Sequence, residues 1–459
     1  MEKFFKLREN NTNIKQEAIA GITTFLTMAY IIAVNPNILG TTGMPQGALV
    51  TATCLAAGLT TILMGLYANL PFALASGMGL NAFFAYSVCG NMHVSWQIAL
   101  TAVLVEGIIF IVLSLTKVRE AVVDTIPMNL KYAVTAGIGL FITFIGFSDA
   151  GIVVPNASTF VSLGNFVTPN VLIAVIGIII IAVMSKKNVR GSMLWGILIC
   201  AILGWIYAAM YPQAASYYKI YPLPKKIFEF KSISPIAFKF DFSYAANPQT
   251  FWSFVTVMFT FLFVDFFDTV GTLVGVASKA NMLDKDGKVP KAGRALLVDA
   301  VGTTLGACLG VSTVTTYVES SAGVAEGGRT GLTSIITGLL FLIAMFFAPL
   351  FIAIPSCATA PALIVVGFLM IGNIVKVDFS DYTEGIPAFL TVAMMPLTYS
   401  IGDGLTMGIL SYTVLNVINN IFTKDSSKKK KISPVMYVLA VIFIIKLVMT
   451  GLQASGYKF

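Results

Sequence analysis

The sequence predicts an all-α polytopic membrane protein. Of its 459 residues, 57% are hydrophobic and only 11% carry a charge. A soluble domain has about 25% charged residues, because charge covers its surface. The apolar residues also form long continuous runs, whereas an outer-membrane barrel has segments of about ten residues in which apolar and polar side chains alternate. Composition and patterning together exclude a soluble enzyme, a disordered chain, a collagen-like chain and a barrel.

The apolar runs predict the individual spans, since a membrane-spanning helix needs about 20 predominantly apolar residues. The chain contains fourteen candidates, followed by a further apolar run at 433–451. The candidates of the first half are 17–38, 48–69, 71–89, 96–116, 129–147, 170–185 and 192–212. Those of the second half are 251–275, 296–311, 313–326, 330–353, 357–374, 385–399 and 403–422.

The charged residues predict the orientation of these spans. With the N-terminus inside, the basic loops 117–131, 186–190 and 279–294 and the run Lys424–Lys431 all fall on the cytoplasmic side, as the positive-inside rule requires. The long loop 213–250 is the exception, and long loops follow the rule weakly. We therefore attribute the net charge of +8 to the basic loops that set the orientation of the spans, and we expect no nucleic-acid binding. The run Lys424–Lys431 also suits contact with anionic lipid.

Short internal matches indicate a repeat. The sequences 126–129 (IPMN) and 354–357 (IPSC) open the fifth span of each half, and 195–198 (WGIL) and 407–410 (MGIL) occur in the seventh. Because seven is odd, the two halves have opposite orientations in the bilayer, which is typical of secondary transporters.

The third and tenth spans are abnormal. The third contains Pro71, Gly77, Gly79 and Asn81, and the tenth, 313–326, is hardly apolar and has Glu319 at its centre. Broken backbone is tolerated inside a membrane only where protein or a water-filled cavity satisfies it. Breaks at equivalent places in two repeats predict a central binding site. Glycine-mediated helix packing is the alternative, but packing does not require Glu319.

Acidic residues inside spans are the second indication of function. A charge at the bilayer centre costs about 2.5–3.5 kcal/mol on insertion scales. Asp265 and Asp268 lie three residues apart on one helix face of the eighth span, and like charges this close favour a carboxyl group that gains and loses a proton. Helix capping or a salt bridge is the alternative. Glu106 and Asp299 are lone acids among apolar neighbours, for which a structural hydrogen bond is at least as reasonable as a function.

Other features favour structural interpretations or exclude whole classes of protein. Glu326 and Arg329 read as a surface pair at the cytoplasmic edge. The chain has one histidine, and its five cysteines lack metal-ligand spacing, so we expect no metal site. It lacks a phosphate-binding GxxxxGK[ST] loop and the motifs of membrane hydrolases, so we expect no cofactor and no enzymatic activity.

Three motifs resemble those of the purine permeases of the nucleobase:cation symporter-2 family. They are 76–84 (SGMGLNAFF), 265–273 (DFFDTVGTL) and 315–323 (TTYVESSAG). Within that family the chain is most similar to the adenine/guanine/hypoxanthine branch typified by AzgA. The elements 34–36 (VNP) and 240–243 (FDFS) fit the same branch.

The resemblance implies fourteen transmembrane segments in two inverted repeats of seven, which we place at 1–225 and 226–459. It implies a core domain built from 15–117 and 251–350 and a gate domain built from 129–212 and 357–422. Spans three and ten would each include a short extended segment, with the substrate between them. Relatives with this architecture are often homodimers. The run 433–451 has no counterpart in this pattern, so we expect an interfacial or peripheral helix, with a span as the alternative.

The resemblance also assigns residues. Glu319 takes the place of the substrate-binding glutamate, Asp265 that of an acid that binds substrate and is linked to proton coupling, and Asn81 that of the polar residue orienting the base. The uracil branch has a histidine where this chain has Thr269, so Asp268 is a possible substitute. The expected substrate site consists of Glu319, Asn81, Asp265, Ala82, Phe83, Val318 and Ser320, and the expected proton-coupling residues are Asp265, Asp268 and Glu319.

These observations predict a proton-coupled symporter of the plasma membrane that imports guanine, hypoxanthine or adenine. The rival hypotheses are a uracil, xanthine or anion transporter of the same fold, and a symporter that uses sodium. A central acid disfavours anions. A channel would need a continuous polar pore, and a membrane enzyme a catalytic constellation.

Overall fold

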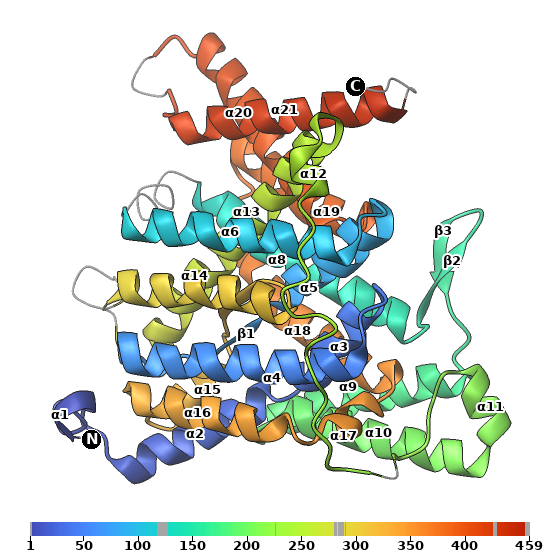
Figure 1. Cartoon of the computed structure of the whole chain (residues 1–459). Helices are drawn as coiled ribbons and strands as arrows, with labels where there is room; N and C mark the ends of the chain where they lie inside the picture. Colours follow the sequence, from blue (N-terminus) through green and yellow to red (C-terminus); the bar gives the residue numbers. More distant parts are fainter. Residues whose placement is uncertain are drawn as a thin grey trace.

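The structure, a computed structural model, consists almost entirely of helices (Figure 1). It describes residues 2–116, 127–224, 226–279, 282, 289, 291–425 and 429–454, and at some positions within α1, α13 and α21 the backbone alone. Within the part of the chain so described, ten helical stretches are long and apolar enough to cross a membrane. The prediction of an all-α membrane protein is therefore confirmed.

Every predicted run contains a helix. The helices of the first half are α1 (Glu2–Phe5), α2 (Ile14–Met28), α3 (Ile31–Gly40), α4 (Gln46–Leu63), η1 (Met64–Ala68), α5 (Met78–Ala82), η2 (Phe83–Asn91), α6 (Trp96–Leu115), α8 (Met128–Asp149), α9 (Pro169–Lys186), α10 (Ser192–Met210) and α11 (Pro212–Tyr217). Those of the second half are α12 (Ser243–Ala246), α13 (Pro248–Lys279), α14 (Ala292–Leu309), α15 (Ser320–Ala325), α16 (Gly331–Ala344), α17 (Ala348–Ile352), α18 (Ser356–Ile371), η3 (Gly372–Lys376), α19 (Tyr382–Leu397), α20 (Ile401–Phe422) and α21 (Pro434–Ala454).

Two short strand pairs interrupt this helical pattern. β1 (Leu74–Ser76) and β4 (Val314–Thr316) lie in the third and tenth predicted spans, where the resemblance implied short extended segments. The two strands pair antiparallel, which was not predicted. β2 (Val153–Asn156) and β3 (Phe160–Leu163) form a hairpin in the loop between α8 and α9, which the sequence did not lead us to expect. The β1–β4 pair is fully buried, whereas the hairpin is largely exposed.

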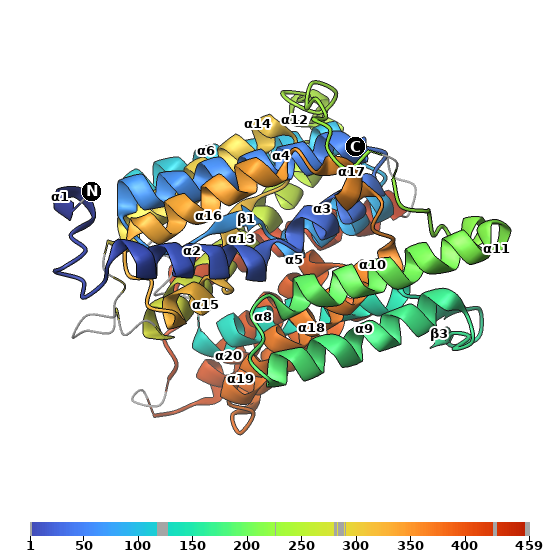
Figure 2. The ribbon, with the colours of Figure 1, turned by 90° about the horizontal axis from the view of Figure 1, so that it is seen from below.

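The long helices form two groups. The first contains α2, α4, α6, α14 and α16, and the second contains α8, α9, α10, α18, α19 and α20. Figure 2 shows the groups as two blocks, with α13, α5 and α3 near their boundary. Packing is dense within each group and sparser between them. The N-terminal helix α1 lies at one end of the helices, and α11 and the β2–β3 hairpin lie at the other (Figures 1 and 2).

A buried glutamate fixes the start of α16. The carboxylate of Glu17, on α2, accepts hydrogen bonds from the backbone N–H groups of Arg329 (2.9 Å), Thr330 (3.3 Å) and Thr333 (3.1 Å). The first N–H groups of a helix lack partners within the helix and carry partial positive charge, so an anion there satisfies both needs. The Arg329 guanidinium donates to the carbonyl oxygen of Val324 instead of pairing with Glu326. The expected pair of Glu326 and Arg329 is therefore wrong.

Glu326 pairs instead with a residue of the other helix group. The Arg190 guanidinium, in the turn between α9 and α10, donates two hydrogen bonds to the Glu326 carboxylate, one of them from Nε at 2.9 Å. Glu326 follows α15 directly, so this bidentate pair joins the end of the tenth predicted span to the second group.

The first group is held together by a close backbone contact. An added Cβ at Gly331 would lie 2.0 Å from the carbonyl oxygen of Gly65, and one at Gly65 would lie 2.4 Å from that of Gly331. Backbone atoms cannot move aside as a flexible side chain can. Only glycine at both positions allows α16 to approach η1 this closely.

We predict that Gly331→Ala destabilises the protein by about 1–3 kcal/mol, because the methyl group overpacks a rigid backbone contact. The measurement is the thermal unfolding midpoint of the purified protein. Gly372→Ala is the matched control, since a Cβ at Gly372 meets nothing within 4 Å. Equal midpoints for the two variants would contradict this account of the α16–η1 contact.

Candidate functional site: the paired breaks and their acids

The two interrupted segments meet as a short antiparallel ladder. Leu74 pairs with Thr316, Ala75 with Thr315 and Ser76 with Val314. The ladder continues beyond the strands, because the Gly77 N–H donates to the Thr313 carbonyl oxygen (3.0 Å) and the Tyr317 N–H to that of Ala73 (2.9 Å). A backbone that leaves the helical conformation inside a membrane must find partners elsewhere, and each break supplies them to the other.

Side chains brace this ladder. The Ser312 hydroxyl donates to Oδ1 of Asn81, and the Tyr317 hydroxyl donates to the carbonyl oxygen of Ser76. The Ser320 hydroxyl accepts from the Ala73 N–H at 2.9 Å. Asn81 and Ser320, two of the expected substrate residues, are therefore fully buried and hold the two breaks together.

Glu319 differs from the other acids of the site in being only half-buried. It occupies the position directly before α15, and the Tyr30 hydroxyl, at the junction of α2 and α3, donates to its Oε1 at 2.7 Å. Its neighbour Val318 is 43% exposed. Tyr30 lies in an ordinary apolar run, and nothing in its local sequence marks it as a functional residue.

Asp265 and Asp299 meet at a single hydroxyl group. Oγ1 of Thr269 lies 3.2 Å from Oδ1 of Asp265, 2.9 Å from Oδ2 of Asp299 and 2.7 Å from Oγ1 of Thr315. All four residues are buried. Thr269 is the position at which the uracil branch was expected to differ, and here its hydroxyl joins α13, α14 and β4.

Glu106 completes the set of buried acids around β4. The hydroxyl of Thr313, the residue before β4, donates to Oε2 of Glu106 at 3.0 Å. Glu106, on α6, thus contacts the residue before β4 directly. Asp265 on α13 and Asp299 on α14 are joined to Thr315 of β4 through the Thr269 hydroxyl. Glu106 and Asp299 thus each have a hydrogen-bond partner, which fits the structural interpretation of these two lone acids.

The remaining expected residues are packed apolar groups or lie outside the description. Ala82 and Phe83 are buried, and the Phe83 ring contacts that of Phe261 edge to face, with centroids 4.9 Å apart. The backbone of Asp268 belongs to α13, but its side chain lies outside the described residues. In the described part of the chain, no group of three or more His, Cys, Asp or Glu side chains could hold a metal ion.

Residues 15–407 match the model of a family described as the permease family. The chain belongs to this family. Because the match covers most of the chain and the family is one of permeases, the prediction that the protein is a transporter and not an enzyme is confirmed.

Curated relatives share the full length of the permease. It is 44% identical over 455 residues to the guanine/hypoxanthine permease PbuG of Bacillus subtilis, covering 97% of this chain and 99% of PbuG. It is 40% identical over 448 residues to the adenine permease AdeP of Escherichia coli, covering 98% of this chain and 96% of AdeP. The resemblance to the purine-permease branch is therefore confirmed.

Solved structures share the fold of the permease at low identity. The transmembrane domain of the cyanobacterial bicarbonate transporter BicA superimposes with a TM-score of 0.63 at 15% identity, covering 86% of this chain and 97% of that domain. Murine Slc26a9, an anion transporter in the inward-facing state, superimposes with a TM-score of 0.62 at 10% identity, covering 89% of this chain and 69% of that one. These likenesses place the permease among multi-pass helical membrane proteins of this fold.

We predict that Thr269→Val destabilises the permease by about 1–3 kcal/mol, because valine keeps the shape of threonine but removes the hydroxyl that contacts three buried oxygen atoms. Thr269→Ser, which keeps the hydroxyl, is expected to lose less stability. The thermal midpoint of the purified protein measures both. A valine variant as stable as the wild type would show that the hydroxyl does not hold these acids together.

Proposed function

We propose that the permease imports purine nucleobases, namely guanine, hypoxanthine or adenine, together with protons. The relatives named for guanine/hypoxanthine and for adenine support this substrate class, because each is at least 40% identical over nearly the whole chain. The two names differ in the purine, so they support the class of substrate and not one base.

The observation that carries the proposal is the half-buried Glu319 beside the paired breaks. Tyr30 donates one hydrogen bond to the Glu319 carboxylate, which can accept about four. Purine bases carry ring N–H donors, and guanine and adenine also carry an exocyclic amino group, so the same carboxylate can accept further hydrogen bonds from a base. Asn81 is buried and accepts a hydrogen bond from Ser312, and it stays a predicted contact of the base. Phe83, Ala82, Val318 and Ser320 stay predicted members of the site.

A count of protons at Thr269 supports proton coupling. Three close contacts surround its hydroxyl, and each needs one proton if it is a hydrogen bond. Thr269 and Thr315 supply one proton each, because a hydroxyl has a single proton to donate. We propose that the third resides on Asp265 or Asp299. We assign the coupled proton to this pair of carboxyl groups, of which Asp265 is the one predicted to take part in proton coupling. Asp268 stays a predicted participant.

The arrangement of helices supports alternating access. We propose fourteen transmembrane segments in two inverted repeats, 1–225 and 226–459, with a core domain that corresponds to the first helix group and a gate domain that corresponds to the second. We place the N-terminus and the basic loops in the cytoplasm and the protein in the plasma membrane. A homodimer is proposed from the resemblance to the family alone.

Competition assays distinguish the rival substrates from purines. Uracil, xanthine and an anion such as sulfate are the alternative substrates, and sodium is the alternative coupling ion. An acid at the centre of the site disfavours an anion, even though an anion transporter shares the fold.

We predict that Glu319→Gln weakens hypoxanthine binding at least about tenfold, because hydrogen bonds to a charged group contribute about 1.5–3 kcal/mol. Isothermal titration of the purified permease measures the affinity. Glu326→Gln is the matched control, since Glu326 lies at the far end of α15 and pairs with Arg190. Unchanged affinity in Glu319→Gln, with the control also unchanged, would refute the assigned role.

We predict that labelled hypoxanthine accumulates in cells or vesicles only while a proton gradient exists. A protonophore is expected to abolish accumulation, and replacing sodium with choline is expected to leave it intact. Asp265→Asn is expected to lose gradient-driven accumulation, because an amide cannot take up the coupled proton. Accumulation that survives the protonophore but needs sodium would assign the coupling to sodium instead.

A further inference from the structure

One lysine of the C-terminal basic run differs from its neighbours. Lys429 and Lys431 are exposed, as expected of a run that faces solvent and lipid headgroups. Lys430, between them, is turned into the protein, and its side chain is only 28% exposed. The run is therefore not a uniform charged surface.

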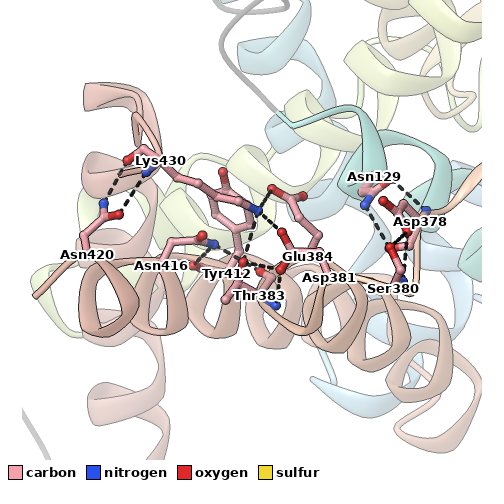
Figure 3. Close-up of polar contacts among 10 residues, drawn as sticks. All are labelled: Asn129, Asp378, Ser380, Asp381, Thr383, Glu384, Tyr412, Asn416, Asn420 and Lys430. Atoms are coloured by element: carbon pink, nitrogen blue, oxygen red, sulfur yellow. Dashed lines mark hydrogen bonds and ion pairs between the residues drawn. The ribbon is translucent and has the colours of Figure 1, made fainter. Parts of the chain in front are cut away.

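The Lys430 ammonium occupies a socket at the start of α19. Its Nζ lies 2.6 Å from Oδ2 of Asp381, 2.9 Å from Oε1 of Glu384 and 3.0 Å from Oγ1 of Thr383, as Figure 3 shows. An ammonium has three N–H donors, and each finds an oxygen atom here. The Lys430 ammonium holds the pKa of Asp381 below its usual range. Partial burial opposes the charge of Lys430, but the hydrogen bonds to Asp381 and Glu384 outweigh it and raise the pKa of the lysine.

The backbone of Lys430 is also held by hydrogen bonds. The Asn420 side chain, on α20, accepts from the Lys430 N–H at 2.9 Å and donates to the Lys430 carbonyl oxygen at 2.8 Å (Figure 3). Asn416 on α20 donates to the Thr383 carbonyl oxygen at 3.1 Å, which ties the socket to the same helix. The residue is thus fixed at both ends by the α19–α20 hairpin.

This attachment lies four residues before α21. The side chains of Met436, Leu439 and Phe443 are buried, and their spacing puts them on one face of the helix. Helix α21 packs against α20, which belongs to the second group, and also against α13, which lies at the boundary of the groups. Its opposite face, with Val438, Val441, Ile444 and Val448, is exposed and apolar.

We propose that Lys430 is the docking residue of the C-terminal helix, and that its seat in the Asp381–Thr383–Glu384 socket holds α21 across α20 and α13. The charge complementarity is specific, since one cation meets two carboxylates and a hydroxyl. Lys429 and Lys431 beside it are exposed. Because α21 contacts both α20 and α13, its docking depends on how α13 lies relative to the α19–α20 hairpin. The proposal stands whether or not the transported molecule is a purine.

The test measures exposure of the docked face in full-length protein held in lipid nanodiscs. Met436→Cys introduces a thiol at a fully buried position, and its labelling by a maleimide is measured above that of the parent, which has five native cysteines. Adding Lys430→Met is expected to speed this labelling about tenfold or more, because that is the change in equilibrium expected when hydrogen bonds between charged groups are lost. Lys429→Met and Lys431→Met remove the same charge from exposed positions and are expected to leave labelling unchanged.

A second variant changes the acidic residues of the socket instead of the lysine. Asp381→Asn with Glu384→Gln is expected to speed labelling as Lys430→Met does, and asparagine keeps the N-cap that Asp381 provides to the Thr383 N–H. Combining this pair with Lys430→Met is expected to add nothing, since both break one interaction. Labelling of Lys430→Met no faster than that of Lys429→Met would overturn the proposal. An equal increase in all three lysine variants would also overturn it, because total charge and not the socket would then hold the helix.

Discussion

The structure depends on the pairing of two broken backbone segments inside the membrane. Helices satisfy their own N–H and C=O groups, but the third and tenth spans contain residues that leave the helix, and lipid offers no partner. β1 and β4 solve this problem together, because each supplies backbone hydrogen-bond partners to the other. The pairing joins distant parts of the chain, so the helices that carry these strands must pack around one centre.

The chemistry of the site follows from that centre. The Thr313 hydroxyl, beside β4, donates to Glu106, and the Thr315 hydroxyl of β4 contacts that of Thr269 on α13. The Thr269 hydroxyl in turn lies between Asp265 and Asp299, so three buried acids gather around the strand. Glu319 follows the strand but stays half-buried, which distinguishes the acid available to a ligand from acids sealed in the protein. One short ladder thereby positions both the proposed substrate contact and the proposed proton site.

Much of the fold was predictable because membrane spans follow composition. Long apolar runs predicted the helices, and Gly77, Gly79 and Glu319 marked the breaks, since these residues conflict with a continuous apolar helix. The three motifs then identified the family. Asp265 and Glu319 were conspicuous because so few charges lie within spans.

The contacts between distant residues could not be predicted in this way. Tyr30 and Glu17 acquire their roles from neighbours far along the chain, and nothing in their local sequence distinguishes them. Thr269 stood out as a departure from the uracil branch, but its contacts with Asp299 and Thr315 were not predicted. The sequence suggested that Glu326 pairs with nearby Arg329, but folding brings Arg190 closer. Lys430 looked like one of several equivalent lysines, and only the position of the α19–α20 hairpin separates it from Lys429 and Lys431.

The central claim is that a purine binds at the half-buried acid beside the paired breaks. An experimental structure of the permease with hypoxanthine tests it most directly. We predict density for the base next to the β1–β4 ladder, with the Glu319 carboxylate within about 2.7–3.2 Å of its N–H groups. Density for the base at another place, with Glu319 contacting only Tyr30, would contradict the account.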